Sequence, residues 1–281
     1  MNKIISNRKI SPNSYELIVE APLCVKKAIP GQFVIVMAHE DSERIPLTIY
    51  DFDKEQGLLY LIYQVIGAST KELTSIKDEL FSVVGPLGKP NEICANPEEY
   101  KKRKIVYVAG GVGIAPVYPQ VKWLKELGFN IDVIYGSRTK ELLLIRDKIE
   151  QVANKVIYTT DDGSYGKKGF VTDRLEEIKD NYDLVVAIGP VIMMKNICDL
   201  TKKYNIQTIV SMNPIMVDGS GMCGACRCEV DGKPKFACIH GPEFDGHKVN
   251  FEKALKRMSI YKEEEKEKLE MMNKILDKEA K

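Results

Sequence analysis

The chain has 281 residues, 44% of them hydrophobic, and 41 basic residues against 40 acidic ones give a formal net charge of +1. This length and composition suffice for two folded domains, whereas the small net charge offers no field for a polyanion, so we expect no nucleic-acid partner. The charged N-terminus lacks a secretion signal, and the longest uncharged run, 105–121, is too short and too rich in Gly and Pro to cross a bilayer. We therefore expect a cytoplasmic protein without a membrane segment.

The first part of the chain, from residue 3 to about residue 84, is rich in short β-type runs separated or flanked by Pro-Asn, Pro-Gly and Gly-Pro breakers. Several short strands at this spacing predict a small antiparallel barrel. The expected strands are 15–20, 32–37, 45–51, 58–65 and 80–84.

From residue 105 onward, apolar strands alternate with helical segments. This alternation predicts an α/β domain with helices on both faces of a parallel sheet. The expected strands are 105–109, 131–135, 155–158, 184–188 and 208–211. The expected helices between them are 115–127, 142–152, 171–179 and 192–204.

The C-terminal part breaks this rhythm. Residues 213–250 are rich in Gly and Cys and show little periodicity, so we expect a ligand to hold them together. Residues 251–281 alternate Lys and Glu, and they place Leu269, Met272 and Leu276 on one helical face. This tail is either a solvated terminal helix or a docking helix for a partner.

Four of the seven cysteines lie in or just after the Gly-rich loop. Asp218, Cys223, Cys226 and Cys238 follow the plant-type [2Fe-2S] spacing, with a carboxylate in place of the first thiolate. Zinc bound by the same four side chains is the alternative. Cys228 is too close to Cys226 for the cluster pattern, so we expect it to pack behind the loop.

Two segments of the expected barrel carry groups that suit a flavin. An Arg and a hydroxyl group lie on one strand, and a Gly-Ala-Ser-Thr turn opens a short helix whose backbone N–H groups stabilise a pyrophosphate. The alternative is structural, with an edge-strand Arg and Ser69 as a helix cap. The predicted FAD-binding residues are Arg44, Pro46, Leu47, Thr48, Ile62, Tyr63, Gln64, Gly67, Ser69 and Thr70.

Glycine turns end two strands of the expected α/β domain and suit close approach to a dinucleotide. Pro116 stands where the usual fingerprint has its third Gly or Ala, and no acid ends the second strand, so a standard Rossmann dehydrogenase is disfavoured. Met193 could instead fill the core. The predicted NAD-binding residues are Gly110, Gly111, Val112, Gly113, Ala115, Pro116, Ser137, Arg138, Gly189, Pro190 and Met193.

A flavin barrel, a nucleotide-binding domain and a cysteine loop, in this order, resemble the ferredoxin reductase superfamily. Over nearly its full length the chain is similar to the small flavin subunits of NADH-dependent reduced ferredoxin:NADP oxidoreductases, also described as sulfide dehydrogenase small subunits. The sister family, the electron-transfer subunits of dihydroorotate dehydrogenase, normally has a Cys at the position of Asp218 and ends before the tail. The flavin motif of ferredoxin reductases has an Arg, one residue, an aromatic and then Ser or Thr, whereas this chain has one extra residue between Arg44 and Thr48. When the motif is aligned on Thr48, Ile45 stands at the position of the flavin-binding Arg.

The resemblance implies an oxidoreductase subunit with FAD, NAD(H) and a [2Fe-2S] cluster. It would pass electrons to a larger flavin and [4Fe-4S] partner in an electron-bifurcating heterodimer, where ferredoxin and NADP(H) are handled. Arg138 keeps NADP(H) open as the nucleotide. The alternatives are a dihydroorotate-oxidising partner and a zinc-stabilised nucleotide-binding protein without turnover. The implied domains are an FAD-binding barrel at 1–97, an NAD(P)-binding domain at 98–212, the cluster loop at 213–250 and the helical tail at 251–281.

Overall fold

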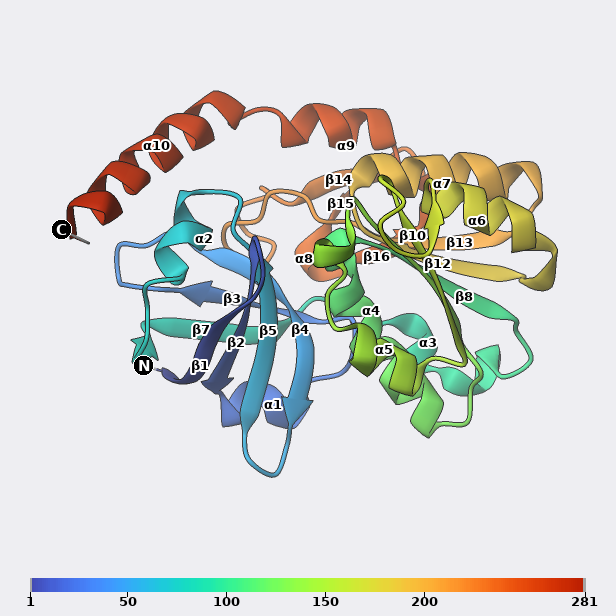
Figure 1. Ribbon diagram of the computed structural model, residues 1–281, viewed down its shortest axis with the longest axis horizontal. Coiled ribbons are helices and arrows are strands. Elements are labelled where there is room, and N and C mark those ends of the chain that lie inside the picture. Colours follow the sequence, from blue (N-terminus) through green and yellow to red (C-terminus); the bar gives the residue numbers. More distant parts are fainter. Residues whose placement is uncertain (1, 280–281) are drawn as a thin grey trace.

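The computed structural model describes residues 2–279, and their side chains as far as residue 274 (Figure 1). Two seven-stranded sheets lie beside each other, and a helical segment arches over the top from the second sheet to the first (Figure 1). Within the described residues, no helix has both the length and the apolar character needed to span a bilayer.

The N-terminal sheet is antiparallel and barrel-like, with strand order β6-β1-β2-β5-β4-β3-β7, as the sequence predicts. β1 is not among the predicted strands, because its mostly polar sequence has no long apolar run. Pairing with β2 and β6 holds it in the sheet. The strands are β1 Asn2–Ser11, β2 Ser14–Glu20, β3 Phe33–Met37, β4 Ile45–Asp53, β5 Leu58–Gln64, β6 Glu79–Leu80 and β7 Ser82–Leu87. Two short helices, α1 Pro22–Lys27 and α2 Ala68–Leu73, interrupt them.

The two faces of β3 have different partners. Val34 and Val36 pack in the barrel core together with Leu47 of β4. Phe33 and Ile35 point to the opposite face, because successive strand residues alternate, and they pack with residues from the C-terminal part of the chain. The outer face of the barrel is therefore a second, separate packing surface.

The second sheet has the order β11-β10-β9-β8-β12-β13-β16. All its pairings are parallel except that of β13 with β16, and the five predicted strands are confirmed. The chain order reverses between β8 and β12, which is where open α/β sheets bind ligands. The strands are β8 Ile105–Gly110, β9 Asp132–Ser137, β10 Lys155–Thr160, β11 Lys167–Lys168, β12 Leu184–Ile188, β13 Gln207–Ser211 and β16 Glu243–Asp245.

The four predicted helices of this part are confirmed, apart from the start of α5, and α3 is an additional short helix. Helix α5 begins at Arg146 rather than at residue 142, because Ile145 adopts a left-handed φ of 45° and residues 140–142 form a separate turn. The helices are α3 Glu92–Ala95, α4 Ile114–Glu126, α5 Arg146–Val152, α6 Val171–Ile178 and α7 Val191–Lys203.

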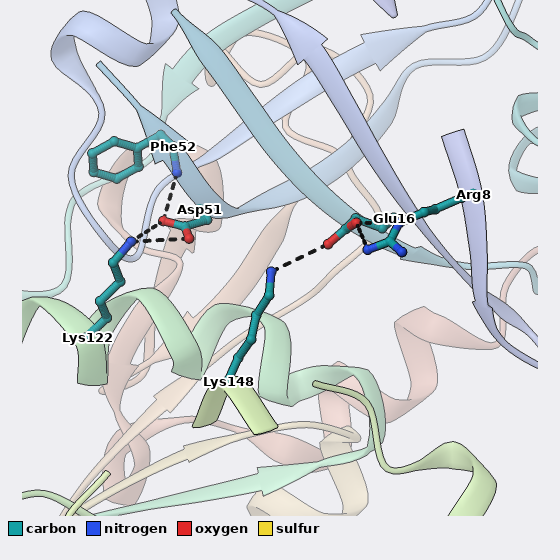
Figure 2. Close-up of polar contacts among 6 residues, drawn as sticks. All are labelled: Arg8, Glu16, Asp51, Phe52, Lys122 and Lys148. Atoms are coloured by element: carbon teal, nitrogen blue, oxygen red, sulfur yellow. Dashed lines mark hydrogen bonds and ion pairs between the residues drawn. The ribbon is translucent and has the colours of Figure 1, made fainter. Parts of the chain in front are cut away.

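Ion pairs join the barrel to the helices of the second sheet (Figure 2). Lys122 of α4 lies 2.9 Å from a carboxylate oxygen of Asp51 on β4. Lys148 of α5 lies 3.7 Å from the Glu16 carboxylate on β2, whose other oxygen accepts from Arg8 at 2.6 Å. The Glu16 side chain is only 4% exposed. Removing its cations would leave a buried charge uncompensated, which is costly.

The C-terminal part contains a hairpin and three helices, namely β14 Arg227–Val230, β15 Lys233–Phe236, α8 Ala237–His240, α9 Phe251–Met258 and α10 Lys262–Glu279. The expected single tail helix is thus divided by a turn at residues 259–261. α9 packs on α7, and α10 packs on α2 of the barrel (Figure 1). Leu269 and Met272 are half-buried, and the side chain of Leu276 lies outside the described residues.

Candidate functional site

The two buried thiols of the expected cluster form a close pair. Sγ of Cys226 and Sγ of Cys238 are 3.1 Å apart, and both residues are 2% exposed. They pack with Phe33 and Ile35 on the outer face of β3. The pair therefore lies between the C-terminal hairpin and the barrel.

The loop before this pair is shaped by glycines. Gly219, Gly221 and Gly224 have φ values of 83°, 86° and 67°, a region that favours glycine. Cys223 is exposed, and hydrogen bonds from the backbone N–H groups of Ala225 and Asp218 lower the pKa of its thiol. The thiolate is the form that binds metal, so the loop favours the ligating state of Cys223.

The four predicted ligands comprise one close pair of thiols and two residues of the glycine-rich loop. Among the described residues, no three His, Cys, Asp or Glu side chains gather as one metal ion would require. The Cys226–Cys238 pair is buried, whereas Cys223 is exposed and Asp218 is half-buried. A [2Fe-2S] cluster would be held by four protein ligands of this kind. Cys228 packs away from them, with its Sγ 3.6 Å from the Lys235 carbonyl oxygen.

Arg44 contacts the cluster loop. Its Nε donates to the Val217 carbonyl at 2.8 Å and its Nη2 donates to the Asp218 carbonyl at 3.2 Å. These two bonds use the guanidinium N–H groups that the flavin-phosphate prediction for Arg44 requires, and Arg44 comes just before Ile45, the first residue of β4. No local sequence pattern signals a partner 173 positions away.

The predicted flavin residues of β4 divide between the two faces of the strand. Pro46 lies opposite Ile35 and Thr48 lies opposite Phe33, so these two side chains share the outer face on which the cysteine pair packs. Leu47 points into the barrel core. A ligand on the outer face could contact Leu47 only through its backbone.

Strand β5 shows a similar division. The Tyr63 hydroxyl donates to Asn7 at 3.0 Å, and its buried ring stacks on Tyr15, so the side chain is directed into the barrel. Ile62 packs in the core shared with the second sheet. Gln64 is half-buried at the strand end.

The turn into α2 uses its hydroxyl groups within the protein. Oγ1 of Thr70 caps the helix by accepting from the N–H groups of Ile66 and Gly67, and Ser69 Oγ donates to the Glu43 carboxylate. Gly67 is therefore the N-cap residue of α2, and Thr70, at the third helical position, supplies the capping side chain in place of Ser69. Gly67 still opens on free space, since a Cβ there would meet nothing within 4 Å.

The glycine turns of the second sheet pack against each other at the strand-order reversal. A Cβ on Gly113 would lie 2.2 Å from the Ile188 carbonyl oxygen, and one on Gly110 would lie 2.4 Å from Sδ of Met193. A Cβ on Gly189 would lie 2.7 Å from Cε of Met193. These glycines allow close packing of β8, β12 and α7, and Met193 lies against two of them, Gly110 and Gly189.

The remaining predicted nucleotide-binding residues lie at or beside the turns that end the strands of the second sheet. Gly111, with φ 55°, has nothing within 4 Å of an added Cβ, and its turn contacts β5 of the barrel. Arg138 is exposed at the end of β9, and the Ser137 hydroxyl donates to the Thr139 carbonyl at 2.6 Å. The other predicted residues follow these turns, namely Val112, Ala115 and Pro116 at the start of α4 and Pro190 before α7.

Comparison with known proteins defines the class. A family model described as the iron-sulfur cluster binding domain of dihydroorotate dehydrogenase B matches residues 213–250, and one described as an oxidoreductase NAD-binding domain matches residues 107–199. The ferredoxin-NADP+ reductase of Plasmodium falciparum shares the fold, with a TM-score of 0.59 at 16% identity. The chain is an oxidoreductase subunit of the ferredoxin reductase fold with an appended iron-sulfur region, and FAD, NAD(H) and a [2Fe-2S] cluster are its cofactors.

Its relatives are similar over nearly the full length. An uncharacterized protein in the adh 3′ region of Clostridium beijerinckii is 50% identical over 272 residues, covering 94% of this chain and 92% of that protein. The dihydroorotate dehydrogenase B (NAD(+)) electron transfer subunit homolog of Thermotoga maritima is 44% identical, covering 95% and 93%. The structure of an NADH-dependent reduced ferredoxin-NADP oxidoreductase, described in terms of flavin-based electron bifurcation, is 41% identical with a TM-score of 0.86, covering 96% and 97%. The chain therefore belongs to the family of electron transfer subunits that includes those of dihydroorotate dehydrogenase B.

Proposed function

We propose that this chain is the small subunit of an electron-bifurcating NADH-dependent ferredoxin:NADP oxidoreductase. One observation carries this proposal: the outer face of β3 and β4 holds both the Cys226–Cys238 pair and the predicted flavin residues Pro46 and Thr48. A flavin on that face would lie against the iron-sulfur ligands. Short separation of two redox groups is what an electron-transfer subunit requires.

Each part of the chain has a separate task in this proposal. The glycine turns between β8 and β12 would position the nucleotide at the strand-order reversal, and an added Cβ at Gly67 or Gly111 would meet nothing within 4 Å. Asp218, Cys223, Cys226 and Cys238 would hold the cluster. Bound FAD would supply the exchange between the two-electron chemistry of NAD(H) and the one-electron chemistry of the cluster.

The proposed partner is a larger subunit with its own flavin and [4Fe-4S] clusters, on which ferredoxin and NADP(H) react. The cluster loop supports such a contact, because its rim is apolar and exposed: Met222 is 90% exposed, Val217 49% and Ile239 44%. Exposed apolar patches mark interaction sites. The cytoplasmic location stays a prediction.

A dihydroorotate-oxidising partner is the second candidate, since several relatives are described as electron transfer subunits of dihydroorotate dehydrogenase B. Asp218 favours the first candidate, because the second family normally has a cysteine there. Affinity purification of the tagged chain from its native cells, followed by mass spectrometry, decides between them. Recovery of a dihydroorotate dehydrogenase instead of a flavin and [4Fe-4S] subunit would overturn the proposal.

The cofactors are tested on anaerobically purified protein. We expect FAD, iron and acid-labile sulfide in the stoichiometry of one flavin and one two-iron cluster. Stopped-flow reduction of the flavin should be faster with NADH than with NADPH. Zinc without sulfide would support a zinc-stabilised protein instead, and a clear preference for NADPH would assign Arg138 to a 2′-phosphate.

A further inference from the structure

A carboxylate outside the site described above joins three parts of the chain. Glu243 lies on β16, in the part of residues 213–250 that follows the last predicted ligand, Cys238, and its oxygens accept from two amides. Asn91 Nδ2 donates to Oε2 at 2.7 Å, and Gln120 Nε2 on α4 donates to Oε1 at 2.8 Å. Asn91 also bonds the barrel segment through its backbone N–H, which donates to the Pro30 carbonyl at 2.8 Å. Glu243 therefore ties the cluster region to the second sheet and to the barrel.

This carboxylate differs from the other acid held between the sheets. Glu16 is paired with Arg8 and Lys148 (Figure 2). Glu243 is half-buried as a residue, but its carboxyl lies against Asn91 and Gln120, which are both 0% exposed. Within the described side chains, no cation forms an ion pair with it.

The titratable groups that face Glu243 are acidic or neutral, namely Glu92 and Cys94 of α3 and Tyr107 of β8. Burying a carboxyl without a cation disfavours its charged form. Burial accordingly raises the pKa of Glu243 to about 7, although the amide bonds from Asn91 and Gln120 act to lower it.

A second observation concerns the amide of Gln120. Its Oε1 is buried and has no hydrogen-bond partner among the described residues. A protonated carboxyl needs an acceptor for its O–H group. A rotation of 180° about the Cγ–Cδ bond of Gln120 exchanges the positions of Nε2 and Oε1. The rotated amide fits the same space, because its oxygen and nitrogen are nearly equal in size. The group beside Glu243 can thus serve either protonation state.

We propose that Glu243 holds an exchangeable proton at neutral pH, and that the Gln120 amide turns to donate to the carboxylate or to accept from the acid. The proton binds at the junction of the barrel, α4 and the cluster region. The contact that joins these three parts therefore changes with pH. This inference does not depend on which partner the chain has.

The direction of the pH effect follows from linkage. The folded chain holds the Glu243 proton more tightly than the unfolded chain, so its contribution to stability is full below the ordinary glutamate pKa and is lost as the pH rises through the folded value near 7. Between pH values of about 5.5 and 8.5, Glu243 alone should raise the unfolding equilibrium constant about 30-fold. The Glu243→Gln variant, which resembles the neutral acid, should lose this part of the pH dependence.

The experiment is infrared spectroscopy of the full chain with its cofactors bound and its glutamate carboxyls labelled with 13C. We expect the carbonyl stretch of a protonated glutamate to disappear with a midpoint near pH 7, and to be missing in Glu243→Gln. Glu126→Gln, at an exposed position of α4, removes the same charge and should keep the band.

A second variant keeps the test decisive if Glu243→Gln does not fold. Gln120→Lys supplies the cation that Glu243 lacks, and it should lower the midpoint by at least one pH unit, a tenfold change in proton affinity. A wild-type chain without a glutamate band that titrates between pH values of about 5.5 and 8.5 would overturn the proposal. So would a band that persists in Glu243→Gln, or a midpoint that Gln120→Lys leaves unchanged.

Discussion

Replacing Arg44 with Met removes the guanidinium that holds the cluster loop to the barrel, while it keeps an unbranched side chain of similar reach. The wild-type residue makes two bonds, to the carbonyl groups of Val217 and Asp218 at 2.8 and 3.2 Å. Hydrogen bonds to charged groups contribute about 1.5–3 kcal/mol each. We halve this range because Arg44 is half-buried and the second bond is long. The expected loss is roughly 1.5–3 kcal/mol, about 10- to 150-fold in the opening equilibrium of the loop.

Hydrogen exchange followed by mass spectrometry measures this opening on the protein with its cofactors bound. Peptides that cover residues 217–226 should exchange about 10- to 150-fold faster in Arg44→Met. The FAD content should not change. Arg146→Met is the matched control, since Arg146 is also a half-buried arginine and lies over the Tyr165 ring at 4.8 Å on α5. It should leave exchange in the loop at the wild-type rate.

One result would refute this reasoning. If Arg44→Met released FAD while the loop exchanged at the wild-type rate, Arg44 would be a phosphate ligand and its contacts with the loop would be incidental.

Four further substitutions, one of them a control, test the site. Cys226→Ser should lose iron and acid-labile sulfide whereas Cys228→Ser keeps both, and equal iron loss in the two variants would contradict the ligand assignment. Asp218→Cys should keep the cluster but change its midpoint potential in an EPR-monitored titration, because thiolate and carboxylate ligands differ in donor character; an unchanged potential removes Asp218 from the ligands. Gly113→Ala places a Cβ 2.2 Å from the Ile188 carbonyl oxygen and should destabilise the chain by about 1–3 kcal/mol in denaturant unfolding. A variant with wild-type stability would show that the end of β12 moves to make room for the Cβ.

The sequence predicts those parts of the fold that depend on local pattern. The five parallel strands are continuous apolar runs, because they are buried on both faces, and their predicted positions agree with the structure to within a few residues. The Gly-Cys loop is also visible, since its spacing reflects the metal it would hold. β1 is missed because its residues are mostly polar and its pairing with β2 supplies the stability.

Contacts between distant residues could not be predicted in this way. Arg44 has a familiar flavin motif around it, yet its partners are backbone carbonyls, which carry no residue-type signal. Tyr63 belongs to the predicted flavin segment, but strand alternation turns its ring inside the barrel. Glu243 lies in a short run without periodicity, so neither β16 nor its two amide partners is evident from the sequence. Only the observed pairing of the strands shows which side chains of β4 and β5 face the barrel core and which face outward.

The tether between Arg44 and the cluster loop also bears on the order of biosynthesis. A ribosome releases the N-terminal barrel well before Val217 and Asp218, which follow Arg44 by 173 and 174 positions. N-terminal regions generally fold first during synthesis. The nascent cysteine loop therefore emerges beside a folded barrel that already presents the Arg44 guanidinium. Iron would then be delivered to the loop late in the maturation of the polypeptide.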